Sequence, residues 1–95
     1  MSMNKRDSLA KKIRDIGGVC FLYPTSRHNV LIETSKDGVE VSLDVYGNEK
    51  ADEPTDTRAE KFETLESALE GFMIDGKPLC DFGCDPVEPF VPTSL

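Results

Sequence analysis

Two segments of the chain have apolar residues at the spacing of an α-helix. In the first, Leu9, Ile13 and Ile16 follow one another at intervals of four and three, which forms one stripe at a period of 3.6 residues. A serine or asparagine ahead of them is suited to cap the start, and the glycine pair at 17–18 tolerates the left-handed conformation that ends many helices. We therefore predict a helix over residues 4–16.

The second helical pattern begins after Thr64, a suitable N-cap residue. Its apolar residues, which we expect to face the core, fall at i, i+3, i+4, i+7 and i+8: Leu65, Ala68, Leu69, Phe72 and Met73. Gly71 weakens the last turn, so the helix is expected to end near residues 71–73. An Asp-Gly pair at 75–76 then favours a turn.

Three strands are predicted between these helices, from runs of β-branched and aromatic residues. They cover residues 18–23, 29–34 and 39–46, with a loop at 24–28 and a tight turn at 35–38. In the third strand, apolar and polar residues alternate strictly: Val39, Val41, Leu43 and Val45 with Glu40, Ser42, Asp44 and Tyr46. Alternation at period two places one face of the sheet on a core and the other in water. Short connections favour an antiparallel meander.

The remaining segments are polar or extended. Residues 47–60 contain Pro54 and many charges, so we expect an exposed loop, followed by a short edge strand at 61–63. Prolines spaced three apart favour an extended tail over residues 85–95. The apolar residues of this tail are Val87, Phe90 and Val91. They indicate that the tail packs across its own domain or docks onto a second copy or another protein.

These elements predict a single α+β domain over residues 1–95. We expect a three- to four-stranded antiparallel meander with an N-terminal and a C-terminal helix packed on one face, in the order α-β-β-β-α. With 95 residues, of which 38% are hydrophobic and 31% charged, the chain can build one core. A deep enclosed pocket in addition is not expected.

Composition also indicates a compartment. No apolar run approaches the roughly 20 residues that cross a bilayer, so we expect no membrane partner. The basic residues near the amino terminus are not followed by the apolar run of a secretory signal, which favours a cytoplasmic protein. Three cysteines, an odd and small number, agree with a reducing compartment.

Charge is distributed unevenly along the chain. The net charge is −7, but residues 1–43 contain seven Lys or Arg and five Asp or Glu, a net of +2, and residues 44–95 contain four and thirteen, a net of −9. An acidic half repels phosphates, so we do not expect a nucleic-acid partner. The same field speeds association with a cationic protein.

Candidate chemistry is sparse. Cys80 and Cys84 are four residues apart, but Cys20 and His28, which would complete a zinc site, are eight apart and separated by a strand end. A disulfide between Cys80 and Cys84 is disfavoured in a reducing cytosol, and the only histidine is distant in sequence from both. We therefore predict no catalytic, cofactor or metal site and no enzyme activity.

Charged helix faces have simpler interpretations. The first helix has five Lys or Arg in residues 5–14, which form its solvated side, contact an acidic surface, or pair with the acidic half of this chain or of a second copy. Glu63, Glu66 and Glu70 recur at helical spacing and are interpreted as a solvated face.

The polar face of the sheet is the feature that best fits a binding function. The predicted partner-binding residues are Glu33, Glu40, Ser42, Asp44, Tyr46, Glu49, Asp52 and Glu53. Tyr46 is a residue type enriched where interfaces hold their binding energy. The expected function is that of a small acidic cytoplasmic protein that binds a basic protein, as inhibitors of the immunity or antitoxin type do.

Two alternatives stay open. One is a structural homodimer or accessory subunit that associates through the tail or a sheet edge. The other, which the sequence favours less, is a small enzyme or zinc protein that uses Cys80, Cys84 or His28.

Overall fold

The computed structural model describes residues 4–48, 50 and 52–87. In chain order its elements are α1 (Lys5–Ile16), β1 (Val19–Thr25), β2 (His28–Ser35), β3 (Gly38–Val45), β4 (Asp56–Phe62), α2 (Leu65–Gly71), β5 (Met73–Ile74), β6 (Lys77–Pro78) and the 3-10 helix η1 (Leu79–Phe82). Strands β1 to β4 form one antiparallel sheet in sequential order, and β5 and β6 form a separate small hairpin. The predicted α+β meander is confirmed.

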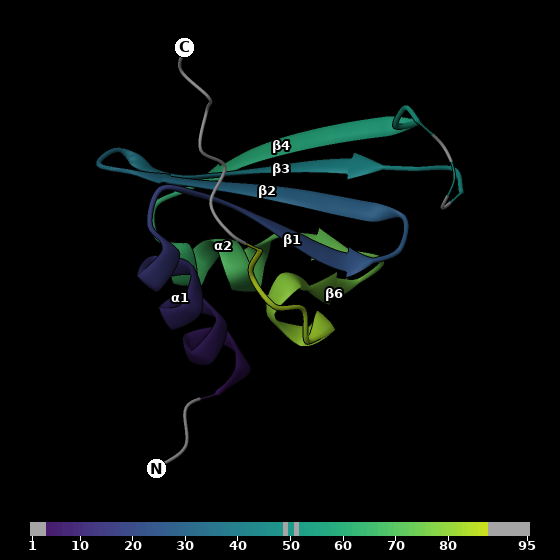
Figure 1. Ribbon diagram of the computed structural model, residues 1–95. Helices are drawn as coiled ribbons and strands as arrows, with labels where there is room; N and C mark the ends of the chain where they lie inside the picture. Colours follow the sequence, from purple (N-terminus) through teal and green to yellow (C-terminus); the bar gives the residue numbers. More distant parts are fainter. Residues whose placement is uncertain (1–3, 49, 51, 88–95) are drawn as a thin grey trace.

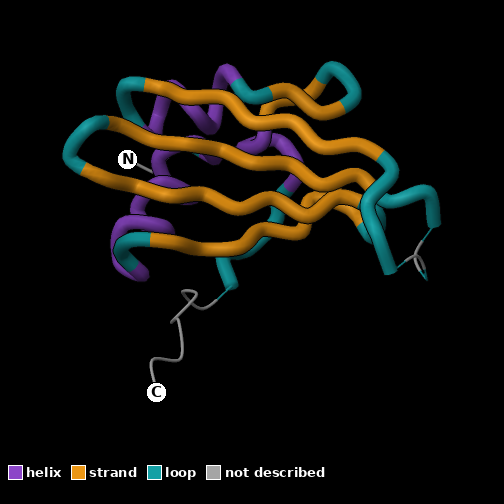
Figure 2. Tube along the Cα trace, turned by 90° about the horizontal axis from the view of Figure 1, so that it is seen from above, coloured by secondary structure: helices purple, strands orange, loops and turns teal. Residues whose placement is uncertain are grey.

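Both helices cover the same face of the sheet, together with the β5–β6 hairpin and η1 (Figure 1). Seen from above, the four strands lie side by side with the helices behind them (Figure 2). We call the face toward the helices the inner face and the opposite one the outer face. The predicted packing of the two helices on one face is therefore confirmed.

Both helices begin and end close to the predicted positions because their caps are encoded locally. The Asn4 side chain accepts a hydrogen bond from the Asp7 N–H at 2.7 Å, and the Thr64 hydroxyl accepts one from the Ser67 N–H at 3.1 Å. Each bond satisfies a backbone donor that the first helical turn leaves without a partner. Gly17 ends α1 with a φ of 78°.

The core lies between the inner face of the sheet and the helices. Its fully buried side chains come from α1, from β1 to β3, from α2 and from the segment after α2, and the largest are Phe72, Ile13, Leu22, Ile32, Leu69, Leu79, Val30 and Val41. The alternation in β3 holds, since Val39, Val41 and Leu43 are buried. Met73 does not join them: it is 44% exposed, because α2 has already ended and β5 leads the chain away.

The segment predicted as an exposed loop over residues 47–60 is partly a strand. β4 begins at Asp56 and pairs with β3 from Val45↔Asp56 to Val39↔Phe62. Every residue of β4 except Phe62 is exposed, so its sequence lacks the alternation of apolar and polar residues from which a strand is predicted. The connection between β3 and β4, residues 46–55, is therefore shorter than predicted, and its described residues other than Tyr46 are exposed.

The β1–β2 connection is also tighter than the predicted loop at 24–28. Pro24 and Thr25 belong to β1, and the register between the strands shifts between Leu22 and Thr25. Proline is tolerated there because β1 is an edge strand. His28, expected in a loop, begins β2 and is buried, and its Nδ1 lies 2.5 Å from the Thr25 hydroxyl.

The described end of the tail contacts β1 on the side that faces away from β2. The Val87 N–H donates to the Phe21 carbonyl at 2.8 Å, in an isolated antiparallel bridge. The other two apolar tail residues, Phe90 and Val91, lie outside the described residues.

Candidate functional site

The outer face of the sheet is organised in rows that cross the strands. One row lies toward the β2–β3 turn, where Glu33 is directly opposite Glu40 and Glu40 is directly opposite Lys61. Side chains of directly opposed residues lie close together, and like charges in this position are destabilising. Two carboxylates therefore share this end of the sheet with one lysine.

The middle row is apolar except for Ser42. Phe21 is opposite Leu31, Leu31 is opposite Ser42, and Ser42 is opposite Ala59. Phe21 and Leu31 are half-buried although they alternate with core residues and point away from the helices. A third row contains Asn29, Asp44 and Thr57. The outer face is thus an apolar stripe with acidic residues on either side.

The sequence-predicted binding residues are only partly brought together. Glu33, Glu40, Ser42 and Asp44 share the outer face. Tyr46 follows the end of β3, is half-buried, and donates its N–H to the carbonyl of the β1–β2 turn.

The loop residues lie apart from the glutamate pair. Asp52 and Glu53 are exposed in the 46–55 loop. This loop follows the Asp44 end of β3, whereas Glu33 and Glu40 lie toward the opposite end. The eighth residue, Glu49, lies outside the described residues.

Sequence reasoning missed the apolar row. Leu31 lies within the continuous apolar run of residues 30–32, where no alternation separates an outward side chain from its buried neighbours. The available signal was polar Asn29 and Glu33, each two residues from Leu31 and therefore on the same face.

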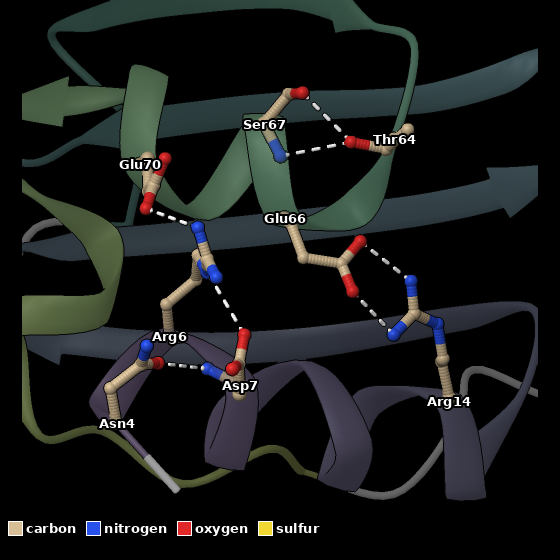
Figure 3. Close-up of polar contacts among 8 residues, drawn as sticks. All are labelled: Asn4, Arg6, Asp7, Arg14, Thr64, Glu66, Ser67 and Glu70. Carbon is tan, nitrogen blue, oxygen red and sulfur yellow. Dashed lines mark hydrogen bonds and ion pairs between the residues drawn. The ribbon is translucent and has the colours of Figure 1, made fainter.

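Four of the five basic residues of α1, namely Arg6, Lys11, Lys12 and Arg14, form ion pairs within the chain. The Arg14 guanidinium contacts both carboxylate oxygens of Glu66, at 2.6 and 2.7 Å, and Arg6 contacts Glu70 at 2.6 Å (Figure 3). The hydrogen bonds from Arg14 lower the pKa of Glu66 to about 2. Glu66 and Glu70 are thus not a merely solvated face: they fasten α2 to α1.

None of these ion pairs includes an acid of the outer face, where Lys61 lies opposite Glu40 but forms no ion pair with it. Among the described residues, every ion pair includes a residue of α1. Lys12 pairs with Asp85 at 2.9 Å, and Lys11 with Asp15 at 3.6 Å. Glu33, Glu40 and Asp44 take part in none of these pairs.

A shallow hollow of about 290 Å³ adjoins the two opposed glutamates. Val19, Glu33, Ser35, Glu40 and Lys61 contribute to its lining, at the end of the sheet where the β2–β3 turn lies. Three carboxylates, those of Glu33, Asp37 and Glu40, border the hollow against the one ammonium group of Lys61, so it accommodates a cationic side chain better than an anionic one.

The cysteines lie on the helix side and have no activated thiol among them. Cys20 and Cys80 are buried and Cys84 is half-buried, all as free thiols. Burial raises the pKa of Cys20 to about 11 and also raises the pKa values of Cys80 and Cys84, so these thiols stay protonated at neutral pH. Within the described part of the chain, no group of three or more His, Cys, Asp or Glu is placed to hold a metal ion.

Comparison with known proteins adds no family. No family model, no curated protein and no solved structure matches this chain. Across residues 4–48, 50 and 52–87, no helix is long and apolar enough to span a bilayer.

Proposed function

We propose that this chain is a protein-binding module that engages a basic protein through the outer face of its sheet. One observation supports this most directly: Glu33 and Glu40 lie opposite each other on that face and neither forms an ion pair. Every ion pair among the described residues includes a residue of α1 instead. A directly opposed like-charged pair costs stability. A partner that supplies a cation between the two carboxylates converts that cost into binding energy.

The composition of the face suits a protein partner. The half-buried Leu31 offers apolar contact at its centre, and Glu33, Glu40 and Asp44 form a charged border. Interfaces have this arrangement, with an apolar centre inside a polar rim. A lysine or arginine of the partner would enter the hollow beside Glu33 and Glu40.

The 46–55 loop extends the acidic surface beyond Asp44. Its exposed Asp52 and Glu53 are placed to guide a basic partner toward the face, because charges at the rim act mainly on the rate of encounter. An inhibitor of the immunity or antitoxin type, acting in the cytoplasm, is the kind of protein that such a surface favours, on charge and size.

The test compares two double reversals with the same change in net charge. Glu40→Lys with Asp44→Lys changes the outer face, and Asp15→Lys with Asp81→Lys changes exposed residues of α1 and η1 on the helix side. Each variant and the wild-type chain are immobilised and exposed to lysate of the source organism at low and at raised salt, and the retained proteins are identified by mass spectrometry.

We expect wild-type protein and the helix-side variant to retain the same basic protein at low salt and to release it at raised salt. The outer-face variant should retain at most about a tenth as much, because two favourable charge contacts become repulsive. Retention of that protein by both variants alike would refute the proposed surface. Circular dichroism confirms that both variants are folded.

A further inference from the structure

The two edges of the sheet differ in how they are occupied. The free side of β1 accepts a backbone hydrogen bond from Val87. At the other edge of the sheet, the side of β4 that faces away from β3 pairs with no strand among the described residues, although β4 is seven residues long. A long edge with unpaired N–H and C=O groups is a template for another strand.

The hydrogen-bond pattern between β3 and β4 determines which backbone N–H and C=O groups of β4 are left without a partner strand. The Val45 carbonyl accepts a hydrogen bond from the Thr55 N–H at 2.7 Å, so Val45 faces β4. Backbone groups alternate in direction along a strand, so Leu43 also faces β4 and is bonded to its partner Arg58. The backbone N–H and C=O groups of Thr57, Ala59 and Lys61 therefore point away from β3, toward the free edge of the sheet.

We propose that β4 pairs antiparallel with β4 of a second copy of this chain, about a two-fold axis at Ala59. In this register Ala59 is opposite the partner's Ala59, and Thr57 is opposite the partner's Lys61. Arg58 is opposite the partner's Glu60, and by symmetry Glu60 is opposite the partner's Arg58. The three outward residues of each chain bond to those of the other.

Charge selects this register over its neighbours. Opposed residues in an antiparallel pair must point to the same face, so a two-fold axis passes through a residue and not between two residues. An axis at Arg58 would oppose two arginines, and an axis at Glu60 would oppose two glutamates, which is unfavourable in both cases. The axis at Ala59 opposes Arg58 to Glu60 and pairs all seven residues of β4, whereas an axis at Thr57 would oppose Arg58 to Asp56 but pair only residues 56–58 of the strand.

The same charges disfavour other partners. Charged side chains on an edge strand discourage pairing with strands of unrelated pattern. Arg58 is held on the inner face of β4, because its guanidinium lies 4.3 Å from the centre of the Phe72 ring and donates to the Met73 carbonyl. The sequence Arg-Ala-Glu at 58–60 is complementary to itself in reverse, so a second copy is the occupant that it fits.

Pairing at Ala59 would also extend the outer face. The row of Phe21, Leu31, Ser42 and Ala59 ends at the axis and would continue into the second copy, giving one eight-stranded sheet from two four-stranded ones. The helices of both copies would then cover the same face. The inference does not depend on the proposed basic partner, since no outer-face acid takes part in it.

Sedimentation equilibrium over a wide range of protein concentration tests the pairing. The wild-type chain should reach twice its mass of 10.5 kDa. In a dimer of Glu60→Arg, arginine faces arginine at two positions, and in a dimer of Arg58→Glu, glutamate faces glutamate at two positions. Each variant should therefore dimerise at least about tenfold more weakly than wild type. An equimolar mixture of the two variants restores both opposite-charge pairs and should form heterodimers with wild-type affinity.

A further variant is needed because Arg58 contacts the core residue Phe72, so Arg58→Glu could weaken dimerisation by destabilising the fold. Ala59→Pro removes an outward N–H without breaking the β3–β4 ladder, and it should leave a folded monomer. Wild-type protein that stays monomeric at its highest concentration would overturn the inference, as would a dimer unaffected by Glu60→Arg and Ala59→Pro. A dimer that is abolished only by deleting residues 88–95 would assign association to the tail instead. Partner capture by the outer-face variants is measured separately, so either proposal can fail alone.

Discussion

Replacing Glu66 with glutamine should weaken the contact between the two helices by an amount that the geometry allows us to state. Arg14 and Glu66 form two short charge-assisted hydrogen bonds, with side chains that are 54% and 33% exposed. Exposed pairs contribute little, whereas bidentate arginine–carboxylate geometry lies at the upper end of that range. We therefore expect a coupling free energy of about 1 kcal/mol between the two side chains.

A double-mutant cycle in urea measures this coupling. The variants are Glu66→Gln, Arg14→Met and both together, since methionine keeps most of the apolar stem of arginine. A loss of about 1 kcal/mol lowers the melting temperature of a domain of this size by roughly 4–8 °C, which thermal unfolding detects readily.

The pH dependence supplies the refuting result. The pKa of Glu66 is lowered from 4.5 to about 2, chiefly by its hydrogen bonds from Arg14. A lowered pKa in the folded state means that the stabilisation is complete above pH 4.5 and is lost as pH falls toward 2. The stability difference between wild type and Glu66→Gln should therefore be constant near neutral pH and shrink below pH 4.5. A difference that is zero at pH 7, or unchanged down to pH 2, would contradict the assigned contact.

Two further predictions concern the backbone and the thiols. Gly38 has a φ of 132°, and a Cβ there would lie 2.6 Å from the Phe62 carbonyl oxygen, so Gly38→Ala should lower the free energy of unfolding in urea by about 3 kcal/mol or more. Gly17→Ala, with a φ of 78° and open space around the new methyl group, should cost only about 1–2 kcal/mol, and equal losses would argue against the clash. In native protein treated with a thiol reagent, mass spectrometry should find Cys84 modified before Cys20, because Cys20 is 1% exposed and has a pKa of about 11. Modification of both at the same rate would show that the core opens more readily than its packing implies.

The sequence was sufficient for the helices and for three strands because each has a period and a local end signal. Thr64 and Asn4 cap their helices through side-chain hydrogen bonds to residues three positions later, which is information within one turn. β4 lacked such a signal. Its residues other than Phe62 are exposed, so no buried residue at every second position marks an inner face, and only the pairing with β3 identifies the segment as a strand.

The candidate site was predictable strand by strand but not across strands. Alternation in β3 placed Glu40 and Asp44 on the outer face, but no periodicity states that Glu33 lies opposite Glu40. That relation depends on register, which the length of the β2–β3 turn fixes. The pairing of Arg14 with Glu66, 52 residues apart, was likewise beyond local patterns, and it determines which acids are left without a cation.

The two proposed associations respond to salt for different reasons. Binding of a basic partner depends on attraction between opposite charges, which salt screens, so raised salt should weaken it. Self-association brings together two chains of net charge −7, whose long-range repulsion salt also screens, while the hydrogen bonds of an added strand pair change little. Raised salt should therefore release the partner and leave pairing through β4 intact or strengthened. At physiological salt the dimer would present two copies of Glu33, Glu40 and Asp44 on one continuous face, and a partner with two basic patches would bind it more tightly than a single copy.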